Sequence, residues 1–392
     1  MIRHFTENLS FASLIAPVTE EEFRAHYWEK QPLIVYRANS AYYSDVFTLR
    51  DVDQAIMRSP EYVKLSDAAT KMSTSYVAPT VPGLETVIAE LRNGSTLVMD
   101  HVELREPKLG LICRVLAQEL GHRFQTNLYL TPPHGRGSVP HWDNHDVFIL
   151  QVLGSKRWTI EKERRAFPGK GDKMGAAGRE FQGALNNFTL NQGDLIYIPR
   201  GFMHAAECGA EASLHITIGV VAFFFEDLLY ATLKTAIQSN ERLRQALPLG
   251  FMNGRRDDIV KHAMAALQQV ADENLVGSVV DLHHDQLIQS HQLDVSGQIV
   301  DVIEAAPLEI DDVVGARRGV VHRTRNVEGG VCVKVGTRSI TFPDFFCEAL
   351  DFALRTPSFA IRGIPGELEA EEKIAFIVRL IDEGLVVRIA PP

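Results

Sequence analysis

The chain has 392 residues, of which 45% are apolar and 23% are charged. This composition is typical of soluble globular proteins and argues against disordered, collagen-like and coiled-coil classes, while the length suggests two or three domains. Forty Lys and Arg face fifty Asp and Glu, which gives a net charge of −10. Neutralising phosphates requires a basic face, so the balance argues against direct nucleic-acid binding but leaves room for a local basic patch.

Neither the cysteines nor the apolar stretches point to export or to a membrane. The four cysteines form no CxxC pair, so we expect no disulfide framework, no zinc ribbon and a reducing cytoplasm. The N-terminus lacks the basic start and long apolar run of a signal peptide. The most apolar stretch, residues 216–225, is about half of the roughly 20 residues that a membrane helix needs, and we interpret it as a buried strand.

Residues 1–90 mix short helical and extended signals. Thr19, followed by three glutamates, predicts the start of a helix with acids in its first turn. Pro32 ends that helix, and residues 33–37 have the pattern of a strand. Residues 107–122 are expected to be helical, with Gly121 as the C-cap.

Between residues 124 and 225 the pattern changes to short strands divided by turns. The six predicted strands are 124–131, 139–145, 147–153, 157–160, 195–199 and 214–223. Gly154-Ser155 predicts a hairpin between two of them. So many strands in so short a stretch indicate an antiparallel β-sandwich or barrel of the jelly-roll kind. The polar segment 161–192, which contains PGKGDKMGAAG, is predicted to be a mobile loop or lid.

From residue 226 onward the apolar residues recur at helical spacing. This stripe must pack on something, so we predict a homodimer, with an intramolecular core as the alternative; its residues include Leu228, Leu229, Leu233, Ile237 and Leu243. Further on, 331–335 and 340–342 are strand-like, and 368–385 is predicted to be a helix that precedes a strand at 386–389. A helix followed by short strands is typical of a small winged-helix module.

The residues that carry chemistry centre on His141-Trp142-Asp143. In a strand, side chains at i and i+2 point to the same face, so His141 and Asp143 can share one cavity, and His204 follows the turn after strand 195–199. Two histidines and one carboxylate leave three positions of a metal open, as in non-haem Fe(II) oxygenases, whereas structural zinc prefers four ligands. The tripeptide alone is a weak signal, and its combination with the downstream histidine carries the prediction.

Lys156 begins the strand after the Gly154 turn. A lysine that points into a barrel is costly unless it meets an anion, and a dicarboxylate cosubstrate would supply one; an exposed turn lysine is the alternative. Asn127, Tyr129 and Thr217 alternate on strands that should flank the same cavity. Each can hydrogen-bond a carboxylate, and each can equally be an ordinary strand residue.

Other histidines are weaker candidates. His215 lies two residues before Thr217 and can point into the same cavity, near metal or substrate. His145 should lie near the end of the strand that carries His141, beside the ligands or in solvent. His283-His284 with Asp285 is expected on a solvated helix face, because adjacent helical residues diverge.

Five segments together resemble the JmjC-type ribosomal oxygenases, which are cupin-like protein hydroxylases that depend on Fe(II) and 2-oxoglutarate. These segments are YWEKQPLIV (27–35), QTNLYLTPP (125–133), PHWDNHDVFILQVLGSKRW (140–158), GDLIYIPRGFMHAA (193–206) and SLHITIG (213–219). The resemblance implies iron ligands at His141, Asp143 and His204. It also implies that Lys156 binds the distal carboxylate of 2-oxoglutarate, and it relates three further residues to the same cosubstrate site: Asn127, Tyr129 and Thr217.

The resemblance further implies an α+β fold: a double-stranded β-helix (jelly-roll or cupin) JmjC domain, a helical dimerisation region and a small winged-helix-like C-terminal domain. The expected boundaries are 1–90 for an N-terminal region that packs on the core, 91–225, 226–304 and 305–392. The implied activity is hydroxylation of a side chain of a protein or peptide, with a ribosomal protein as the family-level expectation, Fe(II) as cofactor, and 2-oxoglutarate and O2 as cosubstrates.

Two alternatives remain open. One is a non-enzymatic cupin that binds metal and acts through partner contacts. The other is a JmjC demethylase, although the sequence offers no obvious aromatic cage for a methylated amine. Residues 38–90 and 161–192 show no pattern that assigns a substrate subgroup.

Overall fold

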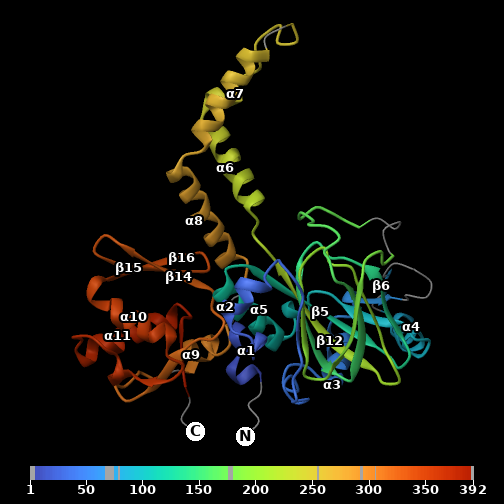
Figure 1. Ribbon diagram of the computed structural model, residues 1–392. Coiled ribbons are helices and arrows are strands. Elements are labelled where there is room, and N and C mark those ends of the chain that lie inside the picture. The colour runs from blue at the N-terminus through green and yellow to red at the C-terminus, as the bar shows by residue number, and fades with distance from the viewer. Residues whose placement is uncertain are drawn as a thin grey trace. The chain divides into compact units, whose positions relative to one another are not determined.

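The computed structural model describes residues 5–66, 75–77, 80–174, 180–253, 256–291, 295–304 and 306–389 (Figure 1). The chain divides into two compact units. The first comprises Met1–Val221 with Arg318–Val320, and the second comprises Ala222–Arg317 with Val321–Pro392.

The first unit is built around two antiparallel sheets. The larger has the strand order β1-β10-β7-β12-β5-β4-β2-β3 and the smaller has the order β6-β11-β8-β9. The larger sheet consists of β1 (Leu33–Val35), β2 (Val63–Ser66), β3 (Ser75–Tyr76), β4 (Thr96–Met99), β5 (Arg123–Thr131), β7 (Asp146–Leu153), β10 (Leu195–Ile198) and β12 (Ser213–Val221). The smaller consists of β6 (Arg136–His141), β8 (Ser155–Glu161), β9 (Leu185–Asn191) and β11 (His204–Glu207).

The core between the sheets is apolar over much of its extent. Val147 and Ile198 of the larger sheet pack in one cluster with Trp158 and Leu190 of the smaller. Side chains alternate along each strand, so β12 turns His215 and Thr217 toward this interior and its aliphatic residues away from it. The predicted antiparallel β-sandwich is therefore confirmed, and all six predicted strands are present.

The predicted hairpin at Gly154-Ser155 is wrong. Strand β7 pairs with β10 and β12, whereas β8 pairs with β11 and β9, so the turn carries the chain from one sheet to the other. Gly154 has φ +63°, and a Cβ there would lie 2.0 Å from the carbonyl oxygen of Ala212. The glycine therefore does mark a tight turn, but turn chemistry cannot tell which sheet receives the next strand.

The polar segment 161–192 is only partly a loop. Its last residues form β9, which pairs with β8 from Ser155↔Asn191 to Glu161↔Leu185. Most of β9 is exposed and rich in Asn, which hides the alternation that marks a half-buried strand. Of the predicted lid at 168–178, residues 175–178 lie outside the described residues.

Helices flank the sheets of the first unit, and two of them begin or end where the sequence predicts. The helices are α1 (Phe11–Ile15), α2 (Glu20–His26), α3 (Leu49–Arg58), α4 (Val81–Arg92) and α5 (Pro107–Leu120). Thr19 caps α2 by accepting a hydrogen bond from the backbone N–H of Glu22. Gly121, at φ +70°, ends α5 in the left-handed conformation.

The second unit begins with helices and ends with two small sheets. It contains α6 (Phe225–Ser239), α7 (Arg256–Val270), α8 (Glu273–Gln289), α9 (Gln298–Glu304), β13 (Val313–Ala316), β14 (His322–Val327), β15 (Gly330–Val335), β16 (Arg338–Pro343), α10 (Cys347–Arg355), β17 (Phe359–Ala360), α11 (Ala370–Asp382) and β18 (Val386–Arg388). The predicted strands near 331, 340 and 386 and the predicted helix near 370 are confirmed. The strands form sheets of order β17-β13-β18 and β14-β15-β16.

Intramolecular contacts cover the apolar stripe of α6 only in part. Helix α6 packs against α8 (Figure 1), and Leu228 and Ile237 are half-buried, yet Leu229 is 67% exposed and Leu233 is 38% exposed. Two leucines of the stripe therefore remain without cover. No helix in the described ranges has both the length and the apolar character needed to cross a bilayer.

Candidate metal centre

The three predicted metal ligands converge at one end of the smaller sheet. His141, the last residue of β6, is paired across the ladder with His204, the first residue of β11. Nε2 of His141 lies 3.9 Å from Oδ1 of Asp143, and Nε2 of His204 lies 3.6 Å from Oδ2. Bonds of about 2.0–2.2 Å to one ion place neighbouring ligand atoms about 3–4 Å apart, so both of these distances already suit ligands of a single ion.

Backbone carbonyls orient both imidazoles. Nδ1 of His141 donates to the carbonyl of Val139 at 2.9 Å, and Nδ1 of His204 donates to the carbonyl of Phe202 at 3.0 Å. A carbonyl only accepts, so each Nδ1 carries the proton and each Nε2 presents a lone pair. The donor set therefore fits a metal, because both lone pairs and the Asp143 carboxylate face one point.

Asp143 lies beyond the end of β6, although the sequence predicted that it lies within the strand. Strand β6 ends at His141, so the predicted strand 139–145 is four residues too long at this end. The carbonyl of Asp143 instead accepts from the backbone N–H of Gly201 at 3.0 Å. Gly201 has φ +82°, and a Cβ there would lie 1.8 Å from the carbonyl oxygen of Ala166, so only glycine fits.

Electrostatics prepare the ligands for a cation. Burial first, and then the neighbouring His141, lower the pKa of His204 to about 4, so that its ring is neutral at neutral pH. Burial alone would raise the pKa of Asp143, but His141 and His204 outweigh it and hold that pKa below its usual value. Metal ligands must be deprotonated, and these two already are.

Lys156 is buried inside the sandwich, not exposed on a turn. It is 2% exposed, and its Nζ donates to Oγ1 of Thr131 at 3.1 Å. None of the ion pairs found among the described residues includes it. Burial lowers the pKa of Lys156 to about 8, although the Cys208 thiol acts in the opposite direction. Gly137 makes room for it, because a Cβ there would lie 2.7 Å from Cε and 2.8 Å from Nζ of Lys156.

Asn127, Tyr129 and Thr217 lie on the paired strands β5 and β12. Asn127 is opposite Thr217 in the ladder. Its Oδ1 accepts from the backbone N–H of His101 at 3.2 Å, and its side chain also hydrogen-bonds the Tyr129 hydroxyl. Burial raises the pKa of Tyr129, whereas this hydrogen bond acts to lower it, as expected when the amide nitrogen donates to the hydroxyl oxygen. The hydroxyl proton of Tyr129 therefore remains available for another acceptor.

His215, one of the weaker candidates in the sequence, is buried beside the predicted cosubstrate residues. It is 4% exposed, and its ring stacks on that of Tyr129, with centroids 4.8 Å apart. Burial and the charge of Lys156 hold the pKa of His215 well below its usual value, so the ring is neutral. The alternation with Thr217 along β12 predicts this inward placement from the sequence.

Two buried polar atoms near Lys156 and Tyr129 have no protein partner among the described residues: Nδ1 of His215 and Nε1 of Trp158. Buried polar atoms are nearly always hydrogen-bonded, and each exception calls for an explanation. Together with the ammonium group of Lys156, which pairs with no acid among the described residues, they indicate an interior that binds a polar, anionic ligand.

The other histidine clusters hold no comparable set. In the described parts of the chain, the only group of three metal-ligating side chains whose ligand atoms gather in one place is His141, Asp143 and His204. On α8, Asp285 pairs with Lys334 at 2.5 Å and His283 donates to the carbonyl of Val279, so the predicted solvated face is exposed only at His284 and the other two residues make structural contacts. His145 lies beside Gly219, with Nε2 3.1 Å from where a Cβ of that glycine would be.

Comparison with known proteins agrees with this geometry. Residues 103–228 match the family model described as the JmjC domain. Ribosomal oxygenase 1 of Gallus gallus is 31% identical over 289 residues, which cover 69% of this chain and 47% of the relative. The chain contains a JmjC domain and is homologous to the ribosomal oxygenases. The JmjC domain includes all seven predicted site residues, so the resemblance seen in the sequence is confirmed.

Other relatives extend the comparison. The bifunctional lysine-specific demethylase and histidyl-hydroxylase NO66 of Aedes aegypti is 28% identical over 71% of the chain. The chain spans about half the length of these relatives. The crystal structure of the Escherichia coli ribosomal oxygenase YcfD aligns with 95% of the chain, with a TM-score of 0.58 and 16% identity. That likeness shows an α+β cupin fold shared over nearly the whole length.

Proposed function

We propose that the chain is an Fe(II)- and 2-oxoglutarate-dependent oxygenase that hydroxylates a side chain of a protein or peptide. The observation that carries the proposal is the combination of a two-histidine, one-carboxylate cluster with a buried lysine that pairs with no acid in the described ranges. A non-enzymatic cupin would need the metal ligands alone. It gives no reason to keep an ammonium group in a closed interior, where it is costly without an anion.

His141, Asp143 and His204 would hold the ferrous ion and leave three positions open. When bound, the ion supplies the redox chemistry that couples oxidation of 2-oxoglutarate by O2 to hydroxylation of a C–H bond. The protein contributes orientation. Lys156 pairs with the distal carboxylate of the cosubstrate, Tyr129 and Thr217 offer hydroxyl donors, and Asn127 holds the Tyr129 hydroxyl in a donor orientation.

The relatives support this class of substrate. The chicken relative is named a ribosomal oxygenase, and YcfD has been solved in complex with cobalt and 2-oxoglutarate. We therefore infer a ribosomal protein as the substrate, and the cytoplasm as the place where it is met. The name of the mosquito relative keeps lysine demethylation as the second candidate, since the same oxidising centre can remove a methyl group.

Succinate formation tests the activity. The purified chain, given Fe(II), O2 and 2-oxoglutarate, should form succinate, and His141→Ala and Asp143→Ala should abolish it. Robust turnover in either variant would refute the assignment. Mass spectrometry of ribosomal proteins from cells with and without the gene should then show one added oxygen atom on the target, whereas demethylation would instead remove a methyl group from a lysine.

The remaining architecture is also a proposal. We infer that 226–304 is a dimerisation region, because the exposed apolar stripe of α6 needs a partner, and that 305–392 is a winged-helix-like domain. The N-terminal region 1–90 then adds β1, β2 and β3 to the sheet of the core 91–225. Light scattering should report a dimer, and Leu229→Glu with Leu233→Glu should give a monomer. A native chain that is already monomeric would contradict the dimer.

A further inference from the structure

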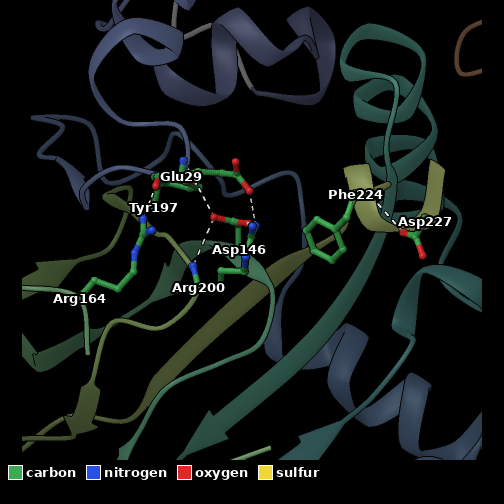
Figure 2. A network of polar contacts seen from close by, with 7 residues as sticks. All are labelled: Glu29, Asp146, Arg164, Tyr197, Arg200, Phe224 and Asp227. Atoms are coloured by element: carbon green, nitrogen blue, oxygen red, sulfur yellow. Dashed lines mark hydrogen bonds and ion pairs between the residues drawn. The ribbon is translucent and has the colours of Figure 1, made fainter. Parts of the chain in front are cut away.

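Glu29, Asp146, Tyr197 and Arg200 form a largely buried network of polar contacts (Figure 2). The network belongs to the segments that carry the metal ligands but supplies none of the ligands itself. Its centre is the carboxylate of Asp146, the first residue of β7, three residues after Asp143. Arg200 stands opposite, in the turn between β10 and β11, four residues before His204. Asp146 is fully buried, and Arg200 is 5% exposed.

One carboxylate holds three donors from the β10 end of the turn. Oδ1 of Asp146 accepts from the hydroxyl of Tyr197 at 2.9 Å and from the backbone N–H of Arg200 at 3.3 Å. Oδ2 accepts from Nη1 of Arg200 at 3.2 Å. Because charge-assisted hydrogen bonds are directional and strong, this arrangement fixes the turn relative to the start of β7.

The segment around Glu29 closes the network from a third direction. Its carboxylate pairs with Nη1 of Arg200, and its backbone N–H donates to the Tyr197 hydroxyl at 2.9 Å. Arg164 donates to the carbonyl of Glu29. Glu29 has φ +54°, a conformation uncommon for residues other than glycine that persists where the surroundings enforce it. Trp28 stacks on Tyr197, with ring centroids 6.2 Å apart.

The network lies between the two segments that bring the ligands together. Asp143 comes from the first segment and His204 from the second, and the hydrogen bond from Gly201 to the carbonyl of Asp143 is a second link between them. The distance between the carboxylate and the imidazole therefore depends on how the Arg200 turn is seated on Asp146. Metal affinity is sensitive to such outer contacts, because they set ligand orientation.

We propose that the Asp146–Arg200 ion pair, closed by Glu29 and Tyr197, is a positioning element that sets the spacing of Asp143 and His204 for the metal. This inference rests on the proposed function, since it presupposes that the cluster binds a cation. A buried ion pair yields little net stability after its desolvation cost, so stability alone is a weak reason to build one here. The four residues are positioning residues, because none supplies a ligand atom.

Titration of the full-length chain with Co(II), followed by visible absorption, tests the proposal. The variants are Asp146→Asn, which keeps the shape but removes the charge opposite Arg200, and the milder Tyr197→Phe. The matched control is Glu383→Gln in the second unit, which removes the charge that pairs the buried Glu383 carboxylate with the half-exposed Arg338 and Arg379. Circular dichroism and thermal melting establish that each variant is folded.

We expect Asp146→Asn to weaken Co(II) binding by about tenfold or more and to alter the absorption band, with a smaller loss in Tyr197→Phe. Glu383→Gln should lower the melting temperature but leave the affinity and band of the native chain. Native-like Co(II) affinity in both Asp146→Asn and Tyr197→Phe would overturn the positioning role. If Asp146→Asn does not fold, Tyr197→Phe decides alone. Absence of Co(II) binding by the native chain itself would remove the proposed function, and this inference with it.

Discussion

The two parts of the sandwich interior differ in whether protein atoms alone meet the packing and hydrogen-bonding needs of their side chains. The apolar cluster around Val147, Ile149 and Ile196 is closed by its own side chains. The other part, which we call the polar wall, is formed by β5, β12 and the start of β8. In the described protein, the ammonium group of its Lys156 pairs with no acid, and Nδ1 of its His215 has no hydrogen-bond partner. The first part explains stability. The second is costly unless a ligand completes it, and this is what marks it as a functional site.

The largest expected effect is a loss of stability when the apolar part is truncated, with little change in cosubstrate binding. Ile149 is 3% exposed, so Ile149→Ala should lower the free energy of unfolding by about 2–5 kcal/mol through lost burial and a residual cavity. Denaturant titration measures this loss. Affinity of the folded variant for 2-oxoglutarate should change far less, and a parallel collapse of affinity would mean that the two parts are not separable.

The polar wall should respond in the opposite way. Lys156→Met removes the buried ammonium while roughly keeping its volume, so the free chain should melt at the same or a higher temperature. Binding of 2-oxoglutarate, measured by calorimetry, should weaken by about 100-fold, as expected when a desolvated charge pair loses one partner. A variant that binds 2-oxoglutarate like the native chain would place the distal carboxylate elsewhere.

The lysine should also make binding and stability depend on pH. Its pKa is about 8 in the free folded protein, against 10.5 when unperturbed. Affinity for 2-oxoglutarate should therefore fall by up to about tenfold per pH unit above pH 8, because the free site loses its proton there. Over the same window the unfolded chain binds more protons than the folded chain, so the contribution of Lys156 raises the unfolding free energy as pH rises from about 8 to 10.5. Lys156→Met should lack both effects.

The space around the ammonium gives a finer test. Gly137→Ala would place a methyl group 2.7 Å from Cε of Lys156 and 2.7 Å from the carbonyl oxygen of Ala206, so the lysine side chain and strand β11 must both shift. We expect a loss of about tenfold in 2-oxoglutarate affinity and a smaller loss of Co(II) affinity, because β11 also carries His204. Gly209→Ala is the matched control, since a Cβ there meets no atom within 4 Å and the residue has no positive φ in the structure. Equal 2-oxoglutarate affinity in the two variants would show that the space Gly137 leaves for Lys156 does not matter for binding.

The smallest expected effect concerns the Tyr129 hydroxyl. Tyr129→Phe removes one hydrogen bond and should weaken 2-oxoglutarate binding by about threefold to tenfold, the range of one net hydrogen bond. Asn127→Ala should have a similar effect, because Asn127 orients that hydroxyl. The double variant should then lose no more than either single one, and calorimetric affinities that add instead would show that Asn127 contacts the cosubstrate itself.

The sequence predicts the local features of this fold better than its long-range ones. Strands such as β7 and β12 follow from runs of β-branched residues, and the caps at Thr19 and Gly121 follow from local backbone chemistry. The sheet that receives β8 is decided by contacts far along the chain, so the hairpin prediction at Gly154 is wrong. Strand β9 was missed because its exposed amides hide the alternation.

The site shows the same division. The HxD spacing predicts that His141 and Asp143 lie together, and they do so even though Asp143 lies outside the strand, where its carbonyl accepts from the backbone N–H of Gly201. The burial of Lys156 and the unpartnered nitrogen of His215 depend on neighbours from several strands, which no local pattern reveals. The same holds for the network that joins Glu29, Asp146 and Arg200.

The most direct test of the central claim is an anaerobic calorimetric titration of 2-oxoglutarate into the chain with and without Fe(II). If the polar wall and the His141, Asp143 and His204 cluster form one site, the native chain should bind one equivalent tightly only when Fe(II) is present, and Asp143→Ala should bind weakly under both conditions. Equal affinity with and without Fe(II), unchanged in Asp143→Ala, would contradict the account.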